Sequence, residues 1–277
     1  MIKKISIIVT FGSLFLFVLL FSVYISKEPN LGRLESISQV LRSEDGSIIN
    51  LRLTPSGHWR EKASLENVDA KLIDMLVAYE DKRFMSHFGV DPLALFRATY
   101  NSFASGRVVS GASTLTMQTV RLMHPELQKR NFKTKLMQML EAVRLERHFT
   151  KEEILEAYFS LAPYGGNIEG VEAASEAWFQ KRPNMLTMSE AALLVALPQS
   201  PELRRPDLFP NNAFKAKRLV LEKTKKRLKI DDTHYPEYIS ERLPNRLRKP
   251  SSITPHLADK FLESGLDSVE TSISVNW

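Results

Sequence analysis

The sequence predicts a mainly α-helical domain behind a single N-terminal transmembrane helix. Two observations predict this class: a run of 21 uncharged, mostly apolar residues near the start, and apolar residues at helical spacing from about residue 67 onward. The chain has 277 residues, 43% hydrophobic and 25% charged, so it can bury a core and is not a disordered protein. It has no cysteine, which excludes disulfide scaffolds, thiolate metal sites and cysteine nucleophiles.

The uncharged run spans residues 5–25 and follows two lysines. About 20 apolar residues cross a bilayer, and the positive-inside rule keeps the basic end in the cytoplasm. A cleaved signal peptide is the alternative, but its apolar region is about 7–15 residues long and is followed by a small-residue cleavage site. The run here is longer, and Ser22-Val23-Tyr24 is a poor cleavage site. We therefore expect residues 1–27 to anchor a single-pass protein in a bacterial cytoplasmic membrane, with the remaining chain outside.

Short strands are expected next, in a juxtamembrane segment over residues 28–66. Runs with alternating apolar and polar residues at 36–42 and 47–53 flank the turn signal Glu44-Asp45-Gly46. This pattern predicts a β-hairpin between the anchor and the helical domain.

The helical domain is expected over residues 67–250, followed by a linker or tail over 251–277. Apolar spacing and capping signals predict its helices in chain order: one ending near Glu80, one from Pro92 towards Phe103 with Asp91 as N-cap, one capped by Ser113 or Thr114, one over 132–149, two beginning at the capping boxes 150–153 and 187–190, and a basic one over 212–229.

The net charge of +6 is unevenly distributed along the chain. Residues 202–250 hold 14 Lys and Arg against 7 Asp and Glu, and residues 121–151 hold 8 Lys and Arg against 3 Glu. Basic segments indicate nucleic acid, an anionic membrane surface or a phosphate-bearing substrate. Because we expect the domain outside the cytoplasm, nucleic acid is not expected as a partner.

The first segment whose side chains could take part in a reaction is Glu80-Asp-Lys-Arg-Phe-Met-Ser-His-Phe-Gly89. An acidic pair is unfavourable at the negative end of a helix dipole, and a locally broken rule indicates a functional site. The alternative is a helix end with solvated charges, and the residues alone leave both interpretations open.

Two further segments could bind an anion. Gly111-Ala-Ser-Thr-Leu-Thr-Met-Gln118 places small and hydroxyl residues before a helix, where unpaired N–H groups suit a phosphate. Taken alone, these residues favour the alternative of an ordinary Ser or Thr N-cap. In the basic stretch 121–151, Lys135 and Gln138 share one helix face, and a solvated surface is the alternative there.

Taken together, these ordered segments resemble the peptidoglycan glycosyltransferases of glycosyltransferase family 51, the polymerising domains of class A penicillin-binding proteins. The resemblance covers about residues 67–230. It extends through Ile154-Leu-Glu-Ala-Tyr-Phe-Ser160, Tyr164-Gly-Gly166, Gly170-Val-Glu-Ala-Ala174, Phe179-Gln-Lys181 and Glu190-Ala-Ala-Leu-Leu, then Leu197-Pro-Gln-Ser-Pro201. It implies a lysozyme-like fold.

The resemblance also implies the substrate and the reaction. Lipid II is the acceptor, the growing lipid-linked glycan is the donor, and lipid pyrophosphate leaves as a β-1,4 bond forms with inversion. Glu80 matches the general base that takes the proton of the acceptor 4-hydroxyl. The matching substrate-binding positions are Asp81, Arg83, His87, Ser113, Thr114, Gln118, Arg121 and Lys135.

The chain departs from the family pattern at Gln138, where a second catalytic-centre glutamate is usual, and at Thr134, where Arg is usual. Glutamine at this position fits the penicillin-binding protein 1C branch. Because an amide forms hydrogen bonds but cannot hold a proton, we expect Gln138 to orient substrate while Glu80 alone transfers the proton.

The motifs Ser-x-x-Lys and Lys-Thr-Gly of the transpeptidase domain are not found, so we expect no labelling by a fluorescent penicillin. Transpeptidases or other cell-wall synthesis proteins are expected partners. No cofactor or protein-bound metal is expected, because the six histidines lack zinc-helix spacing, although Mg²⁺ or Mn²⁺ could bridge the pyrophosphate. An inactive membrane-tethered scaffold and a lysozyme-like glycan-cleaving enzyme are the alternatives.

Overall fold

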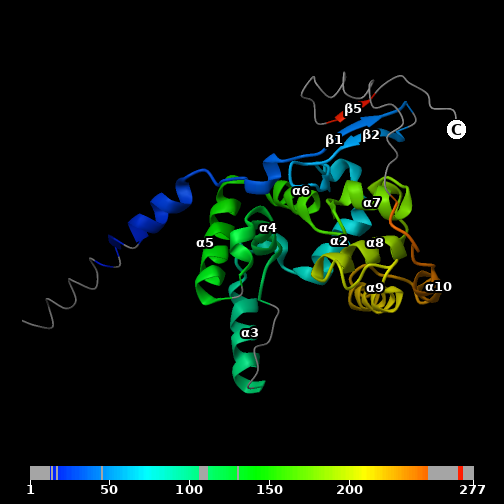
Figure 1. Cartoon of the computed structure of the whole chain (residues 1–277). Helices are drawn as coiled ribbons and strands as arrows, with labels where there is room; N and C mark the ends of the chain where they lie inside the picture. Colours follow the sequence, from blue (N-terminus) through cyan, green and yellow to red (C-terminus); the bar gives the residue numbers. More distant parts are fainter. Residues whose placement is uncertain are drawn as a thin grey trace, which may run out of the picture. The chain divides into compact units, whose positions relative to one another are not determined.

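The computed structural model describes residues 13, 15–16, 18–44, 46–105, 112–129, 131–248 and 268–270 (Figure 1). Contacts divide the chain into two compact units, each built from two separate stretches. The first unit combines Met1–Leu31 with Met85–Ile154, and the second combines Gly32–Phe84 with Leu155–Trp277. The domain boundaries expected from the sequence stay predictions.

The first unit contains three α-helices, α3 (Pro92–Ser105), α4 (Leu115–Met123) and α5 (Phe132–His148), with the 3₁₀ turn η4 (Pro125–Gln128) between the last two. α4 packs against α5 and buries one apolar face. As predicted, α3 begins after Asp91, whose Oδ1 accepts a hydrogen bond from the backbone N–H of Ala94 at 3.0 Å. The cap of α4 is Thr114, which settles the choice between it and Ser113.

Residues 18–26 of the first unit are helical and are followed by a segment held on α5. Arg144 Nε donates to the carbonyl of Lys27 at 2.9 Å, and its guanidinium lies 5.2 Å from the centre of the Tyr24 ring. Within the described part of the chain, no helix combines the length and apolarity needed to cross a membrane. Positions 1–12, 14 and 17 of the predicted anchor lie outside the described residues, so the anchor stays a prediction.

The second unit contains all five described strands. β1 (Gln39–Arg42) and β2 (Ile48–Arg52) form the predicted antiparallel hairpin, and β5 (Ser268–Glu270) pairs with β1 in parallel. β3 (Trp59–Arg60) and β4 (Ile168–Glu169) form a second, parallel pair. The fully buried Arg60 donates through Nε to Glu169 Oε2 at 2.9 Å and ties these two strands together.

The core of the second unit is built on α8 (Met188–Ala196), which packs against α2 (Ala70–Glu80), α9 (Pro210–Thr224) and α7 (Val171–Phe179). Seven of its nine residues are buried, and its alanines allow close helix contacts. Its predicted capping box is present.

Two helices and five 3₁₀ turns complete the list of elements in the described residues. α6 (Lys151–Leu161) follows the predicted capping box at 150–153, and α10 (Tyr235–Ser240) comes after α9. The 3₁₀ turns are η1 (Gly32–Glu35), η2 (Leu65–Asn67), η3 (Phe84–Ser86), η5 (Pro183–Met185) and η6 (Leu197–Gln199).

The structure confirms the mainly helical class but corrects one boundary. The basic helix predicted over 212–229 is α9, which begins at Pro210 and ends at Thr224. After it, Lys229 adopts a left-handed conformation with φ of 50°, and the backbone N–H of Ile230 donates to Lys225 O at 3.0 Å. These turns return the buried Ile230 to the core, whereas a straight helix would not.

Candidate active site

Glu80, the predicted general base, is the last residue of α2 in the second unit. Its Oε1 accepts a hydrogen bond of 2.6 Å from Nε2 of Gln199, which ends η6. Burial and the Glu80 carboxylate raise the pKa of the neighbouring Tyr79, while the Arg204 guanidinium acts in the opposite direction. The Glu80 carboxylate, the Gln199 amide and the Arg204 guanidinium therefore lie close together.

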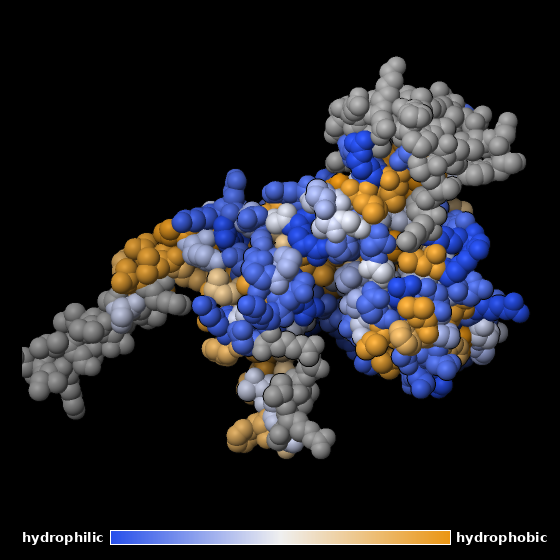
Figure 2. All heavy atoms as spheres, viewed as in Figure 1, coloured by the Kyte–Doolittle hydropathy of each residue, from blue (hydrophilic) through white to orange (hydrophobic). Residues whose placement is uncertain are grey.

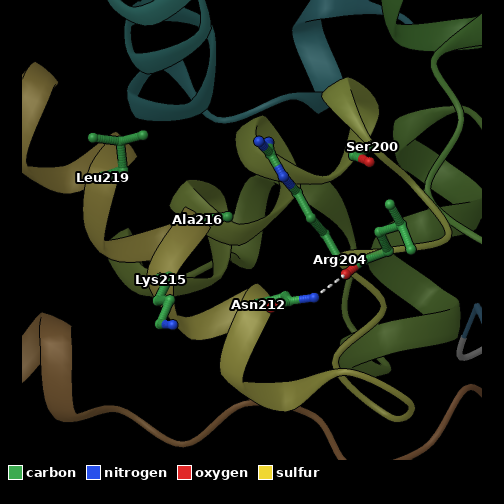
Figure 3. A pocket seen from close by; sticks show the side chains of 7 residues that line it. Ser200, Arg204, Asn212, Lys215, Ala216 and Leu219 are labelled. Atoms are coloured by element: carbon green, nitrogen blue, oxygen red, sulfur yellow. Dashed lines mark hydrogen bonds between the residues drawn. The ribbon is translucent and has the colours of Figure 1, made fainter.

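Arg204 connects this neighbourhood to an open pocket of about 320 Å³ in the second unit (Figure 3). Its Nη1 donates to Gln199 Oε1 at 3.0 Å and to the carbonyl of Ala196 at 2.6 Å. The pocket is lined by Ser200, Leu203, Arg204, Asn212, Lys215, Ala216 and Leu219. Its wall is thus partly basic and partly apolar, and it borders the residues that hold Glu80.

The other predicted residues of this segment differ in exposure. Asp81 is 7% exposed, and its backbone ends α2 by donating to Val77 O at 3.1 Å. Its own carbonyl accepts from the N–H of Phe84 at 3.0 Å, which forms the turn after the helix. Arg83 in that turn is half-buried. Substrate contacts by Asp81 and Arg83 stay predictions.

In the first unit, α4, the residues before it and α5 carry the predicted anion-binding residues. Nζ of Lys135 on α5 donates to Ser113 Oγ at 2.5 Å. Burial lowers the pKa of Lys135, and the nearby Arg121 guanidinium lowers it further. Within the described stretches, neither cation has a carboxylate at ion-pair distance. Arg121 lies in the last turn of α4, and Lys135 contacts Ser113 just before the start of that helix. These two neighbouring cations form a site whose charge an anion would balance.

Thr114, by contrast, uses its side chain within the fold. Its Oγ1 donates to Gly89 O at 2.5 Å and accepts from the N–H of Met117 at 3.1 Å, and the residue is 2% exposed. Gln118 lies one turn further along α4 and is half-buried. The hydroxyl available beside the cations is therefore that of Ser113, while Thr114 shapes the start of the helix.

Gln138 is buried on the same helix as Lys135. Its Nε2 donates to the carbonyl of Leu127 in η4 at 2.6 Å. A carboxylate could not donate this hydrogen bond unless it were protonated. The amide thus has a structural partner in addition to the substrate-orienting role predicted for it.

His87 belongs to a buried ionic cluster that the sequence did not predict. Its Nδ1 lies 3.8 Å from Glu146 Oε1, and both side chains are only 4% exposed. Lys151 Nζ donates to Glu146 Oε1 and to the His87 carbonyl, each at 2.7 Å, and Thr116 Oγ1 donates to Glu146 at 2.5 Å. This cluster joins the His87 loop to α4, α5 and the start of α6, so it supports the anion-binding residues.

Sequence reasoning missed Gln199, Arg204, Glu146 and Lys151. Gln199 stood within a segment that supported the resemblance, but nothing local linked it to Glu80, 119 positions earlier. The charge pattern did not mark Glu146 or Lys151 either, because each lies among other charged residues. No group of three or more His, Asp or Glu side chains within the described ranges could hold a metal ion.

Comparisons with known proteins place this geometry in context. The family model described as Transglycosylase matches residues 46–225. Penicillin-binding protein 1C of Escherichia coli (strain K12) is 41% identical over 186 residues, which cover 67% of this chain and 24% of that protein. Penicillin-binding protein 1A of Aquifex aeolicus (strain VF5) is 32% identical over 210 residues, or 76% of this chain and 28% of that protein. The chain spans about a quarter of the length of these relatives.

A solved structure gives a more distant match. The crystal structure of penicillin-binding protein 1A from Haemophilus influenzae is 19% identical and has a TM-score of 0.43. The match covers 86% of this chain and 25% of that one.

Proposed function

Because this chain belongs to the transglycosylase family, we propose that it polymerises lipid II into the glycan strands of peptidoglycan. The two similar curated relatives are both penicillin-binding proteins, one of them of the 1C type. The structural observation that carries the proposal is the pair of neighbouring cations, Lys135 and Arg121, of which Lys135 contacts Ser113 just before the start of α4. A departing lipid pyrophosphate supplies the negative charge that such a pair would stabilise.

The proposed reaction involves proton removal from the acceptor and departure of pyrophosphate from the donor. Glu80 takes the proton from the acceptor 4-hydroxyl, because an unassisted sugar hydroxyl is too weak an acid to attack. The acceptor oxygen then bonds to the anomeric carbon of the donor glycan. The bond from that carbon to lipid pyrophosphate breaks, and its electron pair leaves with the pyrophosphate. Attack opposite to the leaving group inverts the anomeric centre.

We expect the leaving pyrophosphate to meet Lys135, Arg121 and the Ser113 hydroxyl. The side chain of Ser113 already accepts a hydrogen bond from Lys135, so its own hydroxyl proton can be directed to a phosphate oxygen. A divalent cation, Mg²⁺ or Mn²⁺, that bridges the pyrophosphate remains part of the proposal. Transpeptidases and other cell-wall synthesis proteins remain proposed partners.

The cytoplasmic membrane is the proposed location, because both substrates are lipid-linked. The solvent-facing stripe of α3 supports it: Leu93, Phe96, Tyr100 and Phe103 follow helical spacing on one face and are each at least 66% exposed. Figure 2 shows exposed apolar surface over this helix. Exposed apolar patches of this kind are typical of membrane or protein contacts.

Incubation with labelled lipid II tests the proposal, with separation of the products by length. We expect wild type to form polymer, and Glu80→Gln to reduce the rate by about 100-fold or more, since general-base catalysis contributes about 10²–10⁴-fold. Glu222→Gln, an exposed acid on α9, serves as the matched control and should retain activity. Shortened glycan would identify a lysozyme-like cleaving enzyme, and bound but unchanged lipid II would identify an inactive scaffold.

A further inference from the structure

Gln199 belongs to the segment Leu197-Pro-Gln-Ser-Pro201, which has no assigned role in the proposed reaction. Its side chain nonetheless contacts the proposed base directly, since Nε2 donates to Glu80 Oε1 at 2.6 Å. The two residues come from different elements, the end of α2 and the end of η6. Both elements belong to the second unit, so the contact lies within one compact body.

An amide can face a carboxylate with either its NH₂ group or its oxygen, and only the first orientation is favourable. Arg204 determines which end faces Glu80. Its Nη1 donates to Gln199 Oε1 at 3.0 Å, which requires the oxygen on the arginine side and leaves the NH₂ group towards the carboxylate. The arginine is itself held by a 2.6 Å hydrogen bond from the same Nη1 to Ala196 O at the end of α8.

We infer that Gln199 is a positioning residue for the Glu80 carboxylate and that Arg204 fixes the orientation of the Gln199 amide. This inference rests on the proposed function, in which Glu80 is the general base. Loss of the hydrogen bond removes one restraint on the side-chain torsions of Glu80, so the carboxylate spends less time in the direction of the acceptor hydroxyl. Loss of orientation at a reacting group costs rate far more than affinity.

The sharpest test is Gln199→Met, which keeps the length of the side chain and removes both the donor and the acceptor. We expect kcat for lipid II polymerisation to fall about 10- to 100-fold while KM changes less than about threefold. Because Gln199 is an exposed residue, the melting temperature should stay close to that of wild type. Arg204→Met should lower kcat in the same way, and Arg204→Lys should recover part of the loss.

Gln199→Glu adds a readout that a merely structural role would not change. It places a second carboxylate beside Glu80, and like charges favour protonation of one of the pair. The acid limb of the pH–rate profile should therefore move to higher pH, whereas the limb for Glu222→Gln should not move. Glu222 is exposed on α9 and has no contact with Glu80 or Gln199 among the described interactions, so it is the control.

The outcomes separate this inference from the proposed function. If wild type forms no polymer, or if Glu80→Gln equals wild type, the proposed function fails. If wild type is active and Glu80→Gln is not, yet Gln199→Met and Gln199→Glu both behave like wild type, only the positioning role is refuted. A rise in KM with kcat unchanged would also refute it, because it would assign Gln199 to substrate binding.

Discussion

At the scale of single residues, the candidate site is where local preferences are broken. Glu80 lies at the carboxyl end of α2, where the helix dipole disfavours a negative charge. The 2.6 Å hydrogen bond from Gln199 stabilises the Glu80 carboxylate and offsets part of this unfavourable interaction, and Arg204 contributes a positive charge nearby. Lys135 and Arg121 similarly lie together as like charges. Such arrangements are stable only when neighbours or a ligand compensate them.

Gln138 offers a test of which residue handles the proton. We expect Gln138→Ala to retain measurable polymerisation, at about a tenth of wild type or more, because the side chain cannot accept a proton for transfer. Glu80→Gln should be far less active in the same assay. Equal and complete loss in both variants would contradict the division of labour between base and orienting residue.

Glu172 on α7 predicts a pH dependence of stability. Burial, and next the neighbouring Glu61, raise its pKa from 4.5 to about 7, against the opposing effects of Arg42 and Arg182. The folded state therefore favours the protonated form. This contribution to stability is fully present below the unfolded pKa near 4.5 and is lost as the pH rises through about 7.

Glu172→Gln should remove this dependence. Relative to wild type, we expect the variant to gain stability between pH 5 and pH 8, by roughly 3 kcal/mol at most for the shift involved. Urea unfolding of both proteins at the two pH values measures the difference. Glu222→Gln on the exposed face of α9 is the control. A difference that stays constant with pH would contradict the raised pKa.

At the scale of elements, the parts that could be predicted are those specified by local sequence. α2, α3, α5, α6 and α8 carry apolar spacing or capping residues within their own span, and each was located from the sequence. The parts that could not be predicted depend on distant partners. β3 is two residues long and exists because β4 pairs with it, and α10 is a six-residue helix docked on α8 and α9.

The candidate site likewise contains residues that local sequence identifies and residues that depend on distant partners. Its motif residues could be found because their types and spacing are local, as with Glu80 or the residues before α4. The residues that hold them could not, because Gln199 reaches Glu80 and Glu146 reaches His87 only through tertiary folding. The sequence also could not show that the Thr114 side chain donates a hydrogen bond to the Gly89 carbonyl and caps α4, whereas the Ser113 hydroxyl accepts a hydrogen bond from Lys135.

Gly89, in the loop before α3, has both a conformational and a steric requirement. Its φ is +80°, and an added Cβ would lie 2.5 Å from the carbonyl oxygen of Ala142 on α5. Gly57 has the same conformation, with φ of +81°, but open space around it. We expect Gly57→Ala to cost about 1 kcal/mol and Gly89→Ala at least about 2 kcal/mol more, because backbone must move.

Urea unfolding of the two glycine variants measures this comparison, since the conformational cost is shared. Equal losses of stability would show that the close approach to Ala142 relaxes freely. Because Gly89 O also accepts the hydrogen bond from Thr114, displacement of this loop should reach the start of α4. Reduced polymerisation by folded Gly89→Ala is therefore expected as well.

At the scale of the whole molecule, each compact unit contains one part of the proposed chemistry. The first unit holds the cations and α3, and the second holds Glu80 with Gln199. The first unit also presents the apolar stripe of α3, so the residues expected to meet pyrophosphate share a body with the surface expected to meet lipid.

The stripe predicts a lipid interaction that can be measured. Phe96→Ser combined with Phe103→Ser should lower binding to vesicles of anionic phospholipid by about 100-fold or more, because each buried aromatic side chain contributes about 1.5–3 kcal/mol and about 1.4 kcal/mol is tenfold. Flotation with the vesicles measures it. Thr99→Ser combined with Ser102→Ala on the same helix is the matched control. Unchanged binding by the double Phe variant would show that α3 does not meet the bilayer.

The pairing of β3 with β4 has a consequence for the order in which the protein is made. Arg60 leaves the ribosome 109 residues before Glu169, its buried partner. At a synthesis rate of about 5–20 residues per second, that interval lasts roughly 5 to 20 seconds. Throughout it, β3 lacks its neighbour strand, whereas α3, α4 and α5 are synthesised within it and are complete before β4 emerges. Co-translational folding should therefore begin in those helices, and the second unit should close only after β4 emerges.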